Sequence, residues 1–251
     1  MQQAANHQEH ALKAILLLVL GMSFIPLNDA LIKVMSQRLP LAEIVAMRAV
    51  ISLAILVVFT NGLRSILALD SRTILLFVLR GMCLVAAMYL YFLALSSLPI
   101  STVVSIFFLS PLLITALSAV FLKEKIGSHR ITAVVLALLG VALIMRPGTS
   151  FFKLEMLLAL GSAVSYAIFQ VVTRRLKGVG DLPGLITIQH LCYLVSALPL
   201  LAYNLTGNWE ESGNQSVDFL LRQTVFPTFL ECAFFIVCAF AVLFLSFASS
   251  Y

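Results

Sequence analysis

Charged residues are scarce in this chain, and their scarcity excludes a soluble protein. Only 11% of the residues are Asp, Glu, Lys or Arg, whereas soluble domains carry about 25%. Apolar residues make up 61%, compared with roughly 45–50% in soluble domains. Although the net charge is +5, no basic cluster alternates with aromatic residues, so we expect no nucleic-acid partner.

The signatures of enzymes and metal sites are missing as well. The chain contains no H-E-x-x-H, no G-x-S-x-G, no P-loop and no D-x-x-x-D pair. Its four histidines do not cluster in the sequence, and its four cysteines form no C-x-x-C pair. We therefore expect no enzymatic activity, no cofactor and no bound metal.

What the chain does contain is a series of eight apolar stretches, each near the ~20 residues that cross a bilayer as a helix. They lie at 13–35, 41–60, 74–95, 100–122, 131–147, 154–174, 184–204 and 226–249. No stretch alternates as a barrel strand would. The sequence thus predicts an all-α polytopic membrane protein with about eight spans. Because the first run continues past Asp29 without a cleavage signal, we expect an uncleaved first span.

The distribution of lysine and arginine between the loops predicts the orientation. With a cytoplasmic N-terminus, the inner side holds nine: Lys13, Arg64, Arg72, Lys123, Lys125, Arg130, Arg174, Arg175 and Lys177. The outer side then holds five: Lys33, Arg38, Arg146, Lys153 and Arg222. Since basic residues concentrate on the cytoplasmic side, this excess predicts that the N-terminus is cytoplasmic.

The first two spans carry ionisable residues at bilayer depth. Each costs about 2.5–3.5 kcal/mol to insert, so it is expected to have a partner or a task. Asp29 and Lys33 are one turn apart in span 1, and Glu43 and Arg48 lie in the antiparallel span 2. At 1.5 Å of rise per residue, Asp29 matches Arg48 in depth and Lys33 matches Glu43. We therefore predict two cross-helix ion pairs, Asp29–Arg48 and Lys33–Glu43. Two roles stay open: pinning the hairpin, or handling substrate, protons or gating.

Other polar positions also lie within the spans. Span 6 carries one stripe at helical spacing: Ser162, Tyr166, Gln170 and Thr173. Such a stripe faces either neighbouring helices or a cavity. Pro111 lies in the middle of span 4 and predicts a kinked or broken helix there. Arg80, early in span 3, is expected to extend to the cytoplasmic surface as an anchor.

A faint internal repeat divides the chain. A Leu-Pro pair opens span 2 at 39–40 and span 7 at 182–183. A repeat of five spans would place its second copy upside down in the membrane. We expect a first unit at 1–150 with spans 1–5 and a partial second unit at 151–251 with spans 6–8. Two complete units would have ten spans, whereas the sequence predicts eight. This difference leaves an alternative open: a truncated, non-transporting membrane protein or a structural remnant.

Three stretches resemble the end of an EamA repeat of the drug/metabolite transporter superfamily. They are SPLL at 110–113, FLKEKIG at 121–127 and LGVALIMRPG at 139–148. The stretch DALIK at 29–33, followed by Leu39-Pro40 and Arg48, is similar to the start of the same repeat.

The resemblance implies ten helices in two inverted five-helix repeats around a central cavity lined mainly by helices 1, 3, 4, 6, 8 and 9. It further implies secondary transport of small metabolites or drugs across a bacterial inner membrane. The cavity residues that it implies are Asn28, Asp29, Tyr89, Ser105, Ser110, Tyr166 and Gln170. With Arg48 from the hairpin, these form the expected substrate-binding set. The expected partners are the bilayer and a small-molecule substrate, and a homo-oligomer is left open.

Overall fold

The computed structural model describes residues 25–60, 62–122, 127–146, 148, 151–176, 178–207 and 209–248. All regular structure in these ranges is α-helical. Residues 25–35 are helical. The helices that follow are α2 (Leu41–Phe59), α3 (Gly62–Leu67), α4 (Ser71–Ser97), α5 (Ile100–Phe107), α6 (Ser110–Phe121), α7 (Ser128–Met145), α8 (Glu155–Arg175), α9 (Leu182–Leu205), α10 (Gln215–Leu221) and α11 (Phe229–Ala248).

The helices confirm an all-α polytopic membrane protein. Within the described part of the chain, five segments are long and apolar enough to cross a bilayer: α2, α4, α5 together with α6, α8 and α9. The apolar helical stretches of α7 and α11 are shorter, at His129–Met145 and Phe229–Leu243. These seven helical segments coincide with the predicted spans 2–8. Of the predicted first span only 25–35 is described, and the rest lies outside the described residues.

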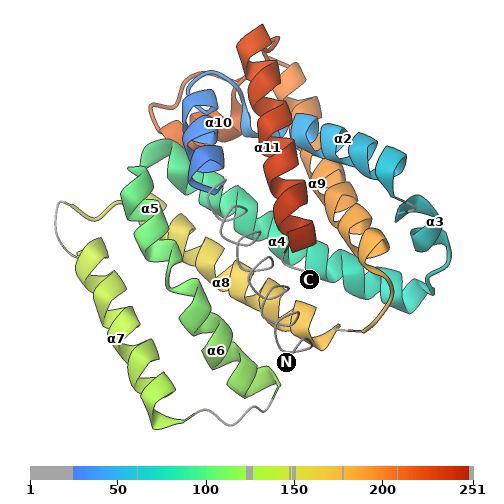
Figure 1. Ribbon diagram of the computed structural model, residues 1–251. Helices are drawn as coiled ribbons and strands as arrows, with labels where there is room; N and C mark the ends of the chain where they lie inside the picture. Colours follow the sequence, from blue (N-terminus) through green and yellow to red (C-terminus); the bar gives the residue numbers. More distant parts are fainter. Residues whose placement is uncertain are drawn as a thin grey trace, which may run out of the picture.

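Helices α4 and α8 pack along each other in the middle of the bundle (Figure 1). On one side α4 contacts α9, α9 contacts α2, and α2 contacts α11. On the other side α8 contacts α5 and α6, and α7 lies at the edge against these two. Small buried residues at a spacing of four, Ala159, Ala163 and Ala167, allow close approach to α8. The hydroxyl of Ser162 donates to the carbonyl of Ala87 on α4 at 2.7 Å.

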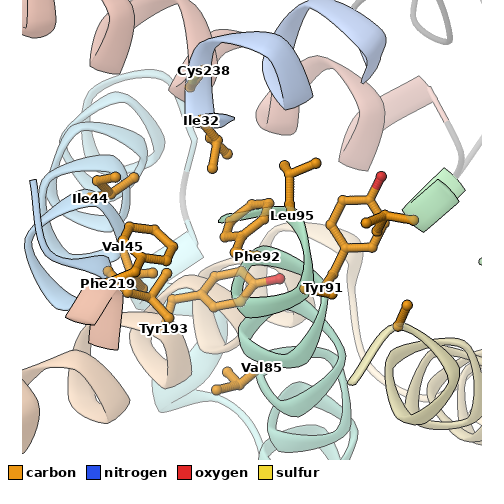
Figure 2. Close-up of a cluster of buried hydrophobic side chains, with 14 of the residues drawn as sticks. Ile32, Ile44, Val45, Val85, Tyr91, Phe92, Leu95, Tyr193, Phe219 and Cys238 are labelled. Carbon is orange, nitrogen blue, oxygen red and sulfur yellow. The ribbon is translucent and has the colours of Figure 1, made fainter. Parts of the chain in front are cut away.

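The apolar core lies where the helical residues 25–35 meet α2, α4 and α9. Figure 2 shows part of it, including Ile32, Phe92 and Tyr193, all of which are buried. Large apolar side chains also cover the outside of the bundle, for example Leu139 and Leu143 on α7. Such a surface suits hydrocarbon, because lipid does not penalise exposed apolar groups as water does.

Two local features bear on the predictions. The predicted break in span 4 is present: α5 ends at Phe107 and α6 begins at Ser110, with Pro111 in its first turn. The predicted outer loop between spans 7 and 8, by contrast, contains the short helix α10. It begins where the Asn214 side chain accepts the backbone N–H groups of Ser216 and Val217, and it buries Phe219 completely.

Candidate functional site

A buried carboxylate marks one end of the candidate site. Asp29 is only 4% exposed, so it must be hydrogen-bonded to remain in an apolar bundle. Its Oδ2 accepts a hydrogen bond from the hydroxyl of Tyr91 on α4 at 2.7 Å. Its Oδ1 accepts a longer one, 3.4 Å, from the Asn28 amide. The amide oxygen of Asn28 is buried and has no hydrogen-bond partner among the described residues.

From Tyr91 a row of aromatic rings crosses the bundle from α4 to α8. We call Tyr91, Phe107, Tyr166 and Phe169 the aromatic line. The centroids of successive rings lie 5.2, 5.3 and 5.8 Å apart, distances typical of interacting aromatic pairs. Gln170 donates a 2.7 Å hydrogen bond to the hydroxyl of Tyr166, one turn before it. The row therefore joins three helices and brings the predicted residues Tyr166 and Gln170 together.

A buried guanidinium lies at the other end of the aromatic line. Arg80 sits 4.4 Å from the centroid of the Phe169 ring. Its Nε donates to the hydroxyl of Thr173 at 2.7 Å, and its Nη1 donates to the amide oxygen of Gln189 at 3.1 Å. The expectation that Arg80 reaches the cytoplasmic surface as an anchor is therefore wrong. Neutral acceptors and an aromatic face hold the side chain inside the bundle instead.

The predicted pair Lys33–Glu43 does not form between these two described residues. The ammonium of Lys33 donates instead to the carbonyls of Leu95, Ser96 and Leu98, at 2.6, 2.8 and 3.0 Å. These carbonyls lie at the end of α4, where the last turn of a helix lacks intrahelical donors. A cation placed there also interacts favourably with the helix dipole. Lys33 is therefore a C-terminal cap of α4.

The predicted pair Asp29–Arg48 is likewise absent between these two described side chains. Asp29 accepts the hydrogen bond of Tyr91, whereas Arg48 lies over the ring of Phe92 and lines a cavity, so the two charges interact only at longer range. Glu43, released from its predicted partner Lys33, accepts the backbone N–H of Val225 at 3.3 Å. Similar depth on two antiparallel helices is thus not sufficient for contact, because the rotation of each helix about its axis decides which way a side chain points.

Arg48 lines a small cavity between α2, α4, α9 and α11. The guanidinium is 5.4 Å from the centroid of the Phe92 ring. Its Nη1 is buried and has no hydrogen-bond partner among the described residues. The cavity has a volume of about 10 Å³. Its lining residues are Val45, Arg48, Ala49, Ser52, Met88, His190, Tyr193 and Val242.

The remaining predicted residues are not part of these contacts. Tyr89 accepts only a long hydrogen bond, 3.5 Å, from the hydroxyl of Ser196 on α9. Ser105 is half-buried in α5, and Ser110 is buried at the start of α6. Since Tyr89 and Tyr91 are two positions apart, they point to different faces of α4. The described contacts place Tyr91, and not Tyr89, against Asp29.

The expected set left out Tyr91 and His190, and it gave Arg80 the role of a surface anchor. The only available signal for Arg80 was the polar stripe of span 6, whose Thr173 needs a partner. For His190 the signal was a titratable side chain in the middle of an apolar span. Within the described ranges, no three His, Cys, Asp or Glu side chains gather as metal ligands.

Known proteins are similar to this chain over much of its length. The family model described as "EamA-like transporter family" matches residues 12–146, more than half of the chain. An S-adenosylmethionine uptake transporter of Rickettsia felis is 25% identical over 207 residues, 78% of this chain and 69% of that protein.

Two further relatives align over shorter stretches. The pseudopaline exporter CntI of Pseudomonas aeruginosa is 30% identical over 166 residues, 65% of this chain and 57% of that protein. A riboflavin transporter of Vibrio cholerae is 28% identical over 123 residues, 49% of this chain and 40% of that protein. Each of these relatives carries the name of a transporter for a small organic solute.

Proposed function

Because the chain belongs to the EamA-like transporter family, we propose that it is a secondary transporter that moves a small metabolite or drug-like solute across a bacterial inner membrane. Its helices form a multi-pass membrane protein, and its relatives from three bacteria are named as transporters. The excess of basic residues on one side supports a cytoplasmic N-terminus.

The observation that carries the proposal is the row of polar and aromatic side chains that runs from Asp29 to Arg80 inside an apolar bundle. It consists of a carboxylate, the aromatic line and a guanidinium, supplied by four different elements of the fold. Ionisable groups buried between membrane helices usually line a solute or ion pathway. Such a row would present charge at its two ends and ring faces in between.

The proposed solute pathway uses the residues expected from the sequence. These are Asn28, Asp29, Arg48, Tyr89, Ser105, Ser110, Tyr166 and Gln170. We further propose that 1–150 and 151–251 are two inverted units that rock against each other about this pathway. In this mechanism Asp29 or Arg48 contacts a polar or charged group of the solute, and breaking the Asp29–Tyr91 hydrogen bond frees the carboxylate for it.

Uptake by proteoliposomes that contain the purified full chain tests the function. Radiolabelled S-adenosylmethionine and riboflavin serve as the first probes, because relatives are named for them. We expect saturable uptake of at least one probe by the unaltered protein. Asp29→Asn should lower that uptake at least tenfold while insertion is unchanged. Leu139→Ala, on the exposed face of α7, is the control and should transport normally.

Two results would count against the proposal. If the reconstituted protein moves neither these probes nor any member of a wider panel of labelled amino acids, nucleosides and vitamins, the non-transporting alternative is favoured. If Asp29→Asn transports as well as Leu139→Ala, transport stands but the pathway does not pass Asp29.

A further inference from the structure

Arg48 is a buried cation that makes no direct ion pair with a carboxylate of the described residues, although Asp29 lies close enough for the two charges to interact. Its side chain is 8% exposed, and Asp29, the predicted partner, is bound by Tyr91. The guanidinium lies over the ring of Phe92, and its Nη1 has no hydrogen-bond partner among the described residues. Moving a guanidinium out of water costs several kcal/mol unless a counter-charge and hydrogen bonds compensate. Among the described residues, the guanidinium therefore lacks an anionic partner in direct contact with it.

The cavity beside Arg48 offers further polar groups. Ser52, one turn after Arg48 on α2, and Tyr193 on α9 both line it. Both side chains are buried, with Ser52 2% and Tyr193 9% exposed. Hydroxyl hydrogens rotate freely, so both groups can donate into the cavity. No aspartate or glutamate is among the lining residues.

His190 completes the polar lining. Its Nδ1 lies 2.9 Å from the carbonyl oxygen of Ile186. Because a carbonyl only accepts, Nδ1 carries the proton. The other ring nitrogen, Nε2, is buried without a partner in the described part of the chain, and the residue is 1% exposed. A protonated ring would add another donor, whereas a neutral ring would present a lone pair.

We propose that this cavity is a binding site for one small inorganic anion, with the size and charge of chloride. Its volume of about 10 Å³ corresponds to roughly one water-sized particle. Arg48 supplies the positive charge, and Ser52 and Tyr193 supply neutral donors. A water molecule in the same place would satisfy the hydrogen bonds, but it would leave Arg48 without an anion in direct contact, and Asp29 interacts with it only at longer range. This proposal goes beyond transport, because it concerns an ion bound in the resting protein.

Thermal unfolding of the purified full chain, in sodium chloride or in sodium gluconate at equal ionic strength, tests the site. A ligand that binds only the folded state raises the unfolding midpoint, and we expect chloride at tenfold its dissociation constant to raise it by roughly 3–6 °C. Arg48→Gln should abolish this difference between the salts. Arg38→Gln is the matched control, since it removes an exposed arginine, paired with Glu231 at 2.6 Å, and should keep the difference.

A second measurement does not depend on the folding of any variant. Crystals of the unaltered protein grown in sodium bromide should show an anomalous peak beside Arg48. An equal unfolding midpoint in both salts, or the same chloride effect in Arg48→Gln as in Arg38→Gln, would contradict the proposal. So would a bromide data set without a peak in the cavity, which would indicate that water fills it. Because none of these measurements involves transport, they are independent of any failure in the uptake assay.

Discussion

At the scale of single residues, the hydroxyl of Tyr91 is the group that makes the burial of Asp29 tolerable. It donates the 2.7 Å hydrogen bond to the carboxylate, and the other donor among the described residues, Asn28, is at 3.4 Å. Hydrogen bonds to charged groups contribute about 1.5–3 kcal/mol, more than those between neutral groups. The hydroxyl of Tyr91 therefore offsets much of the free energy that it costs to bury the carboxylate of Asp29.

Replacing that oxygen tests the argument. Tyr91→Phe should lower the free energy of unfolding by about 1.5–3 kcal/mol, because it leaves the carboxylate of Asp29 underbonded. Tyr89→Phe removes a hydroxyl from the same helix whose hydrogen bond within the described part of the chain is 3.5 Å long, and it should cost much less. Unfolding in mixed detergent micelles would measure both.

A double-mutant cycle supplies the control. In an Asp29→Asn background the charge is gone, so Tyr91→Phe should lose most of its effect. Equal costs of Tyr91→Phe in both backgrounds, or equal costs of Tyr91→Phe and Tyr89→Phe in the unaltered protein, would contradict the role given to Tyr91.

At the scale of elements, the segment before α10 is organised by one carboxylate. Oδ1 of Asp218 accepts from the backbone N–H and the hydroxyl of Ser212, at 2.8 and 2.9 Å, and from the indole N–H of Trp209, at 3.3 Å. Burial raises the pKa of Asp218, but these hydrogen bonds lower it by more, so the pKa lies below the ordinary value of 3.8. The charged form is therefore the one that folds this segment.

The sign of the pH dependence follows from this lowered pKa. The charged carboxylate of Asp218 contributes its full stabilisation to the folded segment above pH 3.8. This stabilisation is lost as the pH falls through the pKa that Asp218 has in the folded state, which is lower than 3.8. Trp209 is the only tryptophan of the chain, so its fluorescence reports on this segment alone. We expect one acid transition below pH 3.8, absent in Asp218→Asn. A transition that persists in Asp218→Asn would assign it to another group.

At the scale of the whole molecule, the assembly of the helices depends on close approach at particular positions. Gly81 on α4 is one of them: a Cβ placed there would lie 2.8 Å from the Sγ of Cys192 on α9. Gly140 on α7 is the opposite case, because a Cβ there would meet nothing within 4 Å. Packing against α9 thus requires a glycine at position 81, whereas the surroundings of position 140 leave room for a side chain.

This difference gives a matched pair of variants. Gly81→Leu should destabilise the bundle by about 1–3 kcal/mol, because overpacking forces α4 and α9 apart. Gly140→Leu should be neutral or slightly stabilising, since glycine costs roughly 1 kcal/mol relative to good helix formers. Detergent-dependent unfolding and yield of monodisperse protein would measure both. Similar behaviour of the two variants would contradict the described packing of α4 against α9.

Much of the fold was predictable, because the properties that determine it are local. Membrane thickness requires about 20 apolar residues per helix, and spans 2–8 coincide with helical segments within a few residues. Pro111 removes a backbone donor, and span 4 is broken beside it. The helix α10 was missed, because its stability comes from the Asn214 cap and the burial of Phe219 in a neighbouring surface.

By itself, the sequence determined that this chain consists of membrane-spanning helices, which residues share a helical face, and which family repeat it resembles. Only the tertiary structure decided the partners of the buried charges: Tyr91 for Asp29, the end of α4 for Lys33, and a small cavity for Arg48. Hydrogen bonds within a helix depend on neighbours in the chain. The direction in which a long polar side chain points depends on the rotation of its helix, and every packed neighbour contributes to that rotation.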